Sequence, residues 1–277
     1  MLQRVLSRHN VQQRGQGART LVFVHGYGCD QRMWRFVAPA FEADHRVVLL
    51  DLVGAGGSDV SAFDPARHGS LEGYAQDLVE VCDALELEGA TLVGHSVSAM
   101  IAALASLRAP RRVGALVLVA PSPCYLNHPP DYHGGFERRD LDELLALLDA
   151  NLVGWADALA PTIMGNPEQP ERTRELRDSF CSLDPTIARV FARATFYGDN
   201  RADARAVAVP SLIMQCASDA IAPAAVGRWL HANMAGSELR TLRATGHCPH
   251  MTHPAETIAV LRAYLDAGHR GGSRRDA

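Results

Sequence analysis

Short apolar runs alternate with helical segments along most of this chain. Six runs have the length and aliphatic content of buried β-strands, namely residues 20–24, 46–50, 91–93, 114–119, 209–215 and 237–242. Between them apolar residues recur at helical spacing, most clearly in the segment that begins at Ser70. This alternation predicts an α/β fold with a mostly parallel sheet and helices on both faces. We also expect an edge strand at residues 5–11. A helix capped by Asp30 is expected next to the first buried run, because Met33, Trp34, Val37 and Phe41 recur at helical spacing.

The alternation stops after Pro121. No strand-like run follows until about residue 199, and the intervening sequence has helical stretches at residues 141–152, 155–164, 171–181 and 185–196. An all-helical insertion between strands of a parallel sheet predicts a lid. We therefore expect a core of residues 1–121 and 199–267, a helical lid at residues 122–198 and a disordered tail at residues 268–277.

Composition narrows the class of protein. Of 277 residues, 47% are hydrophobic and 21% are charged, which is ordinary for a globular enzyme. The net charge of -4 argues against a nucleic-acid surface, and no run approaches the roughly 18 apolar residues of a membrane span. Six scattered cysteines and a polar N-terminus favour a cytoplasmic location. The absence of lysine excludes pyridoxal and Walker A chemistry, and we expect no cofactor.

A strand that turns abruptly into a helix is the most informative stretch. Residues 91–93 form the expected strand, Gly94 breaks it, and a small, apolar helix is expected from Val97. A serine at such a turn projects its hydroxyl beyond the sheet, where the next backbone amide faces the group that it attacks. Ser96 is thus the candidate nucleophile. The usual Gly-x-Ser-x-Gly pattern ends here in Ser98.

The rest of the chain supplies partners for this serine. Asp219 follows the first strand after the predicted lid, and His247 follows the last strand. A serine needs a base to accept its proton and a third group to orient that base, and carboxyl ends of parallel strands meet at one edge. The sequence therefore predicts a Ser96-His247-Asp219 triad. The backbone amides of Tyr27 and Val97 are the expected oxyanion donors.

Other chemistries fit this sequence less well. Three histidines and a cysteine between residues 247 and 253 superficially suggest zinc, but the flanking prolines predict an extended loop, and we expect no metal. A serine rather than an aspartate at the turn favours acyl transfer, mainly ester or lactone hydrolysis.

Several motifs carry a resemblance that covers nearly the whole chain. Residues 25–31, 94–100, 121–127, 134–137 and 246–251 resemble the bacterial RsbQ regulators, a group similar to the plant strigolactone and karrikin receptors. The resemblance implies the α/β-hydrolase fold and a deep apolar pocket. It places six residues in the pocket lining: Tyr27, Tyr125, Phe136, Trp155, Leu159 and Phe196. The plant receptors have Phe at the positions of Tyr27 and Leu159, so we expect a pocket of different polarity and width.

Two functions remain open from the sequence. One is hydrolysis of a small apolar ester or lactone through an acyl-enzyme on Ser96. The other, implied by the resemblance, is a small-molecule sensor with slow turnover that signals to a protein partner. In RsbQ-like systems that partner is a PAS-domain phosphatase of the general stress response.

Overall fold

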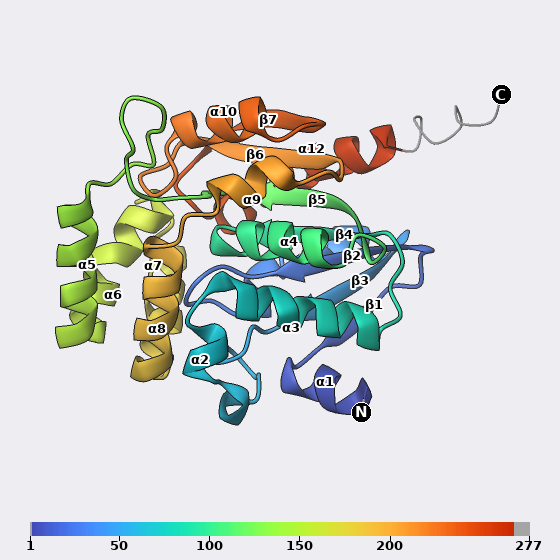
Figure 1. The fold of residues 1–277 in the computed structure, drawn as a ribbon, viewed down its shortest axis with the longest axis horizontal. Coiled ribbons are helices and arrows are strands. Elements are labelled where there is room, and N and C mark those ends of the chain that lie inside the picture. The colour runs from blue at the N-terminus through green and yellow to red at the C-terminus, as the bar shows by residue number, and fades with distance from the viewer. Residues whose placement is uncertain (1, 269–277) are drawn as a thin grey trace.

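A single seven-stranded sheet organises the computed structural model, which describes residues 2–268 (Figure 1). Apart from Gly268, the predicted disordered tail lies outside the described residues. The strands are β1 (Gln12–Arg14), β2 (Arg19–Val24), β3 (His45–Leu50), β4 (Ala90–His95), β5 (Val113–Val119), β6 (Ser211–Ser218) and β7 (Ser237–Thr245). Their spatial order is β1-β3-β2-β4-β5-β6-β7. The six expected strands are all present, and the α/β prediction is confirmed.

The strand register brings distant loops together. Strands β2 to β7 are parallel to one another, and among the strands of residues 2–268 only β1 runs antiparallel, beside β3. Val24 of β2 pairs with Gly94 of β4, so the loop that follows β2 meets the turn that contains Ser96. Strands β6 and β7 come next beyond β5, so the loops that carry Asp219 and His247 lie at the same edge.

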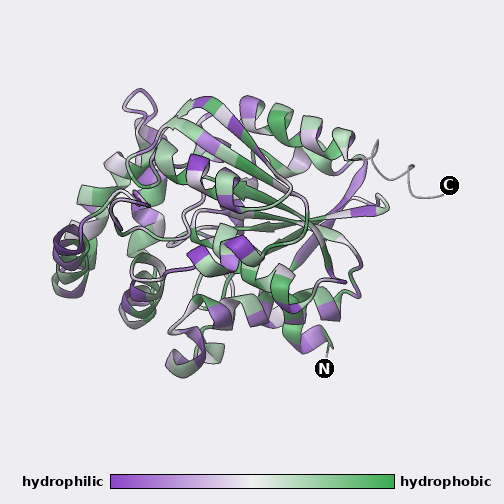
Figure 2. Cartoon of the chain, turned by 45° about the horizontal axis from the view of Figure 1, so that its top comes forward, coloured by the Kyte–Doolittle hydropathy of each residue, from purple (hydrophilic) through white to green (hydrophobic). Residues whose placement is uncertain are grey.

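Helices cover both faces of the sheet. The core helices are α1 (Leu2–Arg8), η1 (Gln31–Trp34), η2 (Ala38–Phe41), η3 (Val60–Ala62), α2 (Pro65–His68), α3 (Leu71–Ala84), α4 (Val97–Arg108), α9 (Arg201–Ala206), α10 (Ala224–Asn233), α11 (Pro249–Thr252) and α12 (Pro254–Ala267). Helices α3, α4, α9 and α10 follow one another in contact across one face, and α11 packs with η1 and α12. Purple segments gather on the outer helices in Figure 2, whereas the central strands are mostly green. The core therefore lies between sheet and helices, where Phe23, Trp34 and Tyr74 are fully buried.

Two local predictions near the N-terminus were wrong. Residues 2–8 form helix α1 rather than an edge strand, and the edge position belongs to the short, exposed β1. Val5 and Leu6 pack against the core from a helix, which ends in a turn at Asn10 with a positive φ of 46°. The helix expected around Met33 and Phe41 is two separate 3₁₀ turns, η1 and η2. Asp30 caps the first of these through a bond from the amide of Arg32.

A block of four helices follows β5 and precedes the core helix α9. These helices are α5 (Arg138–Ala150), α6 (Leu152–Met164), α7 (Pro170–Cys181) and α8 (Pro185–Phe196), close to the predicted stretches. Figure 1 shows them beyond the carboxyl ends of the strands, to the left of the sheet. We call them the helical insertion. No helix between residues 2 and 268 combines the length and apolar character that a membrane span requires.

Candidate active site

The turn between β4 and α4 holds Ser96 in a strained backbone conformation. Its φ of 56° and ψ of -123° lie outside the regions that ordinary residues adopt. Gly94 permits the turn, because a Cβ there would lie 2.3 Å from the carbonyl oxygen of Ser98. The Ser98 hydroxyl donates to the carbonyl oxygen of His25, which ties the turn to the loop after β2. Serine in place of the usual glycine thus adds a hydrogen bond between two loops.

The predicted triad residues lie in contact. His247 Nε2 is 2.7 Å from Ser96 Oγ, and His247 Nδ1 is 2.7 Å from Asp219 Oδ2. The Nδ1 proton points at the carboxylate, which leaves Nε2 free to accept the serine proton. All three residues are buried. A buried, hydrogen-bonded chain of this kind can activate the hydroxyl as a nucleophile.

Asp219 stays ionised in this buried place. Burial by itself would raise the pKa of its carboxyl group, but His247 and the amides of Ile221 and Ala222 lower the pKa below its ordinary value. Those two amides donate to Oδ1 at 2.8 and 3.0 Å, so the oxygen that does not face His247 is also satisfied. The carboxylate therefore orients the imidazole as an anion at neutral pH.

Two further histidines pack around the loop of His247. His95 Nε2 donates to the backbone carbonyl of His247 at 2.8 Å, and burial lowers the pKa of His95 to about 3. The ring of His250 lies 4.4 Å from that of His95 and 4.5 Å from that of Trp34, measured between centroids. Neither ring nitrogen of His250 has a hydrogen-bond partner among the described residues. These contacts hold the loop that carries His247 against β4 and η1.

The segment around His250 differs from its prediction. Residues 249–252 form the short helix α11, not an extended loop. Within the described part of the chain, the histidines at 247, 250 and 253 do not form a group that could hold a metal ion. His250 instead fills the space between η1 and the β4 turn.

Ser96 lines a small, apolar cavity. It is lined by Tyr27, Cys29, His95, Ser96, Tyr125, Trp155, Leu159, Ile163, Leu176, Phe180, Thr195, Phe196, Ile221, His247 and Cys248. Its free volume is about 30 Å³, room for about one water molecule. Five of the six pocket residues implied by the resemblance line this cavity. A bound ester therefore requires side chains of the lining to move.

Two tyrosines set the polarity of this cavity. The Tyr125 hydroxyl lies 3.3 Å from Ser96 Oγ, and burial raises the pKa of Tyr125 to about 12. The Tyr27 hydroxyl donates at 2.9 Å to the carbonyl oxygen of Ala188 in α8. Its ring contacts those of Trp155 and Phe196. Tyr27 thus links the loop after β2 to the helical insertion.

Phe136 is the implied pocket residue that does not line the cavity. Its backbone amide donates to the carbonyl of Tyr125, and residue 136 pairs with Leu126 in a β-bridge. This pairing holds the ring edge-on against Tyr125, with centroids 6.5 Å apart. Sequence reasoning also missed several lining residues, among them Cys29, Ile163, Leu176, Phe180 and Ile221. Cys29 could have been found, because it directly follows the loop that carries Tyr27.

A larger hollow of about 620 Å³ adjoins the apolar cavity. It shares Cys29 and Leu176 with the cavity, but none of the triad residues lines it. Four of its charged side chains form ion pairs within the lining, Arg32 with Asp30 and Arg35 with Glu175. The chemistry therefore belongs to the smaller, apolar cavity.

The sheet topology, the strained serine turn and the Ser-His-Asp contacts together define an α/β hydrolase. The chain belongs to the alpha/beta hydrolase family, whose model matches residues 21–260. It is 36% identical to strigolactone esterase D14 of Arabidopsis thaliana over 94% of this chain and 97% of that protein. It is also 36% identical to the karrikin insensitive 2 receptor CA of Petunia hybrida, over 93% of this chain and 95% of the receptor. The resemblance to strigolactone and karrikin receptors is thereby confirmed.

A solved structure gives the same picture. A hydrolase from Oleispira antarctica superimposes with a TM-score of 0.94 and 43% identity, covering 96% of this chain and 97% of that one. The similarity extends through the helical insertion, since it covers nearly the full length of both chains.

Proposed function

We propose that this protein is a serine hydrolase that cleaves a small apolar ester or lactone through an acyl-enzyme on Ser96. The observation that carries the proposal is the chain of contacts from Ser96 Oγ through His247 to Asp219, at the floor of an apolar cavity. The esterase named among the relatives supports the same reaction class.

The reaction follows from the geometry. His247 Nε2 takes the proton of Ser96 as Oγ attacks the carbonyl carbon of the substrate. The resulting imidazolium is stabilised by the Asp219 carboxylate, and it then protonates the leaving oxygen. Water, deprotonated by His247, hydrolyses the acyl-enzyme. In a lactone, the leaving oxygen stays tethered to the acyl chain as a hydroxyl group, so hydrolysis of the acyl-enzyme releases a hydroxy acid.

The amides of Tyr27 and Val97 are our proposed oxyanion donors. Val97 begins α4 directly after the nucleophile, and the loop of Tyr27 is held against the turn by the Ser98 to His25 bond. Gly26 allows this close approach, because a Cβ there would lie 2.5 Å from His95 Nδ1. Each donor is expected to contribute about 10²- to 10³-fold in rate.

We propose that the helical insertion, within the predicted segment 122–198, acts as the lid that selects the substrate. Trp155, Leu159 and Phe196 form the insertion side of the cavity, and they offer apolar surface. An ester whose acyl and alkoxy parts are both small and apolar suits this lining. Charged substrates would leave their polar groups without partners there.

A second candidate function is ligand sensing with slow turnover. It is supported by the relatives named as receptors and by the small volume of the cavity. In an RsbQ-like setting the sensor would act on a protein partner such as a PAS-domain phosphatase. Slow release of the acyl group would then prolong the ligand-bound state.

A fluorophosphonate probe tests the nucleophile. We expect it to label the wild-type protein at Ser96 and to leave Ser96→Ala unlabelled, with Ser106→Ala as a matched control that labels normally. Equal labelling of the wild type and Ser96→Ala would refute the assignment. Burst kinetics with short p-nitrophenyl esters then separate the two functions. A large burst followed by very slow turnover favours the sensor, and steady turnover favours the esterase.

A further inference from the structure

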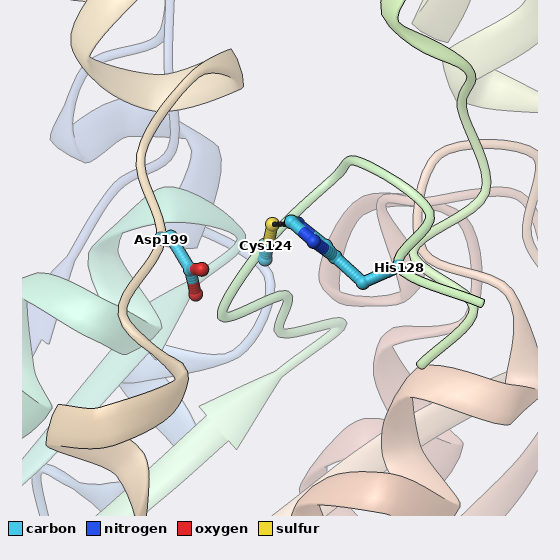
Figure 3. A group of neighbouring side chains, drawn as sticks. All are labelled: Cys124, His128 and Asp199. Carbon is cyan, nitrogen blue, oxygen red and sulfur yellow. Dashed lines mark hydrogen bonds between the residues drawn. The ribbon is translucent and has the colours of Figure 1, made fainter. Parts of the chain in front are cut away.

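A cysteine, a histidine and an aspartate come together where the helical insertion leaves and rejoins the sheet. Cys124 and His128 follow β5, and Asp199 follows α8 (Figure 3). One ligand atom from each residue lies within 4.8 Å of the others. Figure 3 shows the His128 ring directed at the sulfur of Cys124, with Asp199 on the opposite segment. These three residues take no part in the proposed hydrolysis.

The spacing of these atoms matches a tetrahedral metal site. Cys124 Sγ lies 3.6 Å from His128 Nε2. Zinc bonds of about 2.3 Å to sulfur and about 2.0 Å to nitrogen, at a tetrahedral angle, separate the two ligand atoms by about 3.5 Å. An ion could therefore bind both atoms with little movement of either side chain.

The backbone around this cluster is already fixed. The carbonyl oxygen of Cys124 accepts bonds from Ser122 Oγ at 2.9 Å and from the Tyr132 hydroxyl at 2.5 Å. The amide of His128 donates to the carbonyl of Tyr132 at 2.9 Å. A β-bridge joins Cys124 to Asp199 across the two segments. A preorganised set of ligands binds a metal at a smaller entropic cost than a mobile one.

Two contacts compete with a metal: the Cys124 thiol donates to the carbonyl oxygen of Leu126 at 3.7 Å, and Asp199 forms an ion pair. Arg201 donates to both oxygens of Asp199, at 2.8 and 2.6 Å. Asp199 Oδ1 also accepts from the backbone amide of Arg201 at 3.2 Å, whereas Oδ2 accepts one bond and keeps a lone pair, so Oδ2 can bridge the guanidinium and an ion. The positive charge of Arg201 weakens the binding of a cation, although the thiolate and carboxylate neutralise a divalent ion. We therefore expect weaker binding than at a four-ligand structural zinc site.

We propose that Cys124 Sγ, His128 Nε2 and a carboxylate oxygen of Asp199 form a binding site for zinc or a similar divalent cation, with a fourth position left to water. Binding replaces the thiol proton of Cys124, which passes to solvent. The ion would join the two ends of the helical insertion. Cys124 is followed in the chain by Tyr125, which contacts Ser96, so the joint lies one residue from the catalytic cavity.

Cobalt(II) provides a direct test with the full-length protein. We expect titration of the wild type with Co²⁺ to give the visible bands of a tetrahedral complex and a near-ultraviolet sulfur-to-cobalt band, both removed by an excess of Zn²⁺. The sulfur band should disappear in Cys124→Ser, and the visible bands should weaken at least tenfold in His128→Asn and Asp199→Asn. The matched controls Cys181→Ser and His133→Asn should bind as the wild type does.

Thermal unfolding provides the second readout. Zn²⁺ that binds only the folded state raises the melting temperature of the wild type and of both controls, but not of the three ligand variants. Circular dichroism without metal checks that every variant is folded. Absence of the sulfur band in the wild type, or its survival in folded Cys124→Ser, would overturn the proposal. Neither result bears on the proposed hydrolysis, because fluorophosphonate labelling of Ser96 needs no metal.

Discussion

The two sides of the catalytic cavity are built by different interactions. On the core side, Ser96, Asp219 and His247 stand at strand ends and are fixed by short hydrogen bonds. On the insertion side, Trp155 and Phe196 offer ring contacts and apolar surface. Hydrogen bonds have direction and fix the reacting atoms, whereas apolar packing tolerates exchange of one side chain for another. The core side can thus keep one chemistry while the insertion side varies the substrate.

Hydrogen bonds also join the core side of the cavity to the insertion side. The amide of His247 donates at 2.7 Å to the carbonyl oxygen of Ile163 in α6. The side-chain amide of Asn166 donates to the carbonyls of Met164 and Thr245. The end of α6 is therefore part of the support of the catalytic histidine. The following changes test how far each side depends on the other.

The largest effect is expected from His247→Ala. Loss of the base should lower kcat for a p-nitrophenyl ester by about 10³-fold or more, with a smaller change in KM. His253→Ala, six residues later, should keep nearly full activity. A loss of tenfold or less in His247→Ala would mean that another group acts as the base.

Gly246→Ala tests the contact between the sides. A Cβ at this position would lie 1.9 Å from the carbonyl oxygen of Met164, and its φ is 79°. Gly236 has a similar φ of 71° with open space around it, so Gly236→Ala isolates the backbone strain, about 1 kcal/mol. We expect a clearly larger loss of unfolding free energy and of kcat in Gly246→Ala. Equal losses in the two variants would mean that the end of α6 can shift away from residue 246 at little cost and does not support His247.

Acid should destabilise the core side through its buried histidines. Burial holds the pKa of His95 at about 3 and that of His250 well below 6.5, so both stay neutral in the folded protein. Below about pH 6.5 the unfolded chain binds protons that the folded state does not, so stability falls as the pH falls toward the folded-state pKa. Each such group contributes up to about 1.4 kcal/mol per pH unit.

Replacement of His250 makes this testable. Denaturant unfolding of His250→Leu between pH 7.5 and 4.5 should show a pH dependence that is shallower by up to one proton. Met251→Leu, in the same short helix, changes no titrating group and serves as the comparison. An unchanged slope in His250→Leu would contradict the burial of a neutral ring.

The smallest effect is expected from Tyr27→Phe. This change removes the hydroxyl that bonds Ala188 but keeps the ring in the cavity wall. A net hydrogen bond is worth about 1 kcal/mol, so we expect a loss of that size in unfolding free energy and a few-fold change in KM. Tyr264→Phe, on α12, serves as the comparison. A large fall in kcat would show that the hydroxyl holds the oxyanion loop as well as the insertion.

The sequence predicted the core side well for a physical reason. Strand ends in a parallel sheet meet at one edge, so order along the chain was enough to bring Asp219 and His247 to Ser96. Phe180 and Ile163 could not be assigned in this way, because a helix position has no fixed relation to the cavity until the helices have packed. Phe136 was misplaced because its backbone pairs with residue 126, a contact without a sequence signal.

Local sequence effects explain the remaining differences between the predicted and the observed structure. Residues 2–8 contain good helix formers as well as Val5, and packing of Val5 and Leu6 on the core favoured the helix. Prolines at 249 and 254 each begin a helix instead of excluding one, since proline fits the first turn. Cys124 and His128 were visible as neighbours in the sequence, but Asp199 joins them only after the insertion has returned to the sheet.

The bond between Ile163 and the amide of His247 has a consequence for engineering. A chimera that exchanged the whole insertion with that of a relative would replace one partner of a backbone hydrogen bond next to the base. A chimera should instead keep the last turn of α6 together with the loop that carries His247, and exchange only the other parts of the helical insertion. Such a chimera should conserve the reaction while altering the range of substrates. The segment that can be exchanged is therefore shorter than the whole helical insertion.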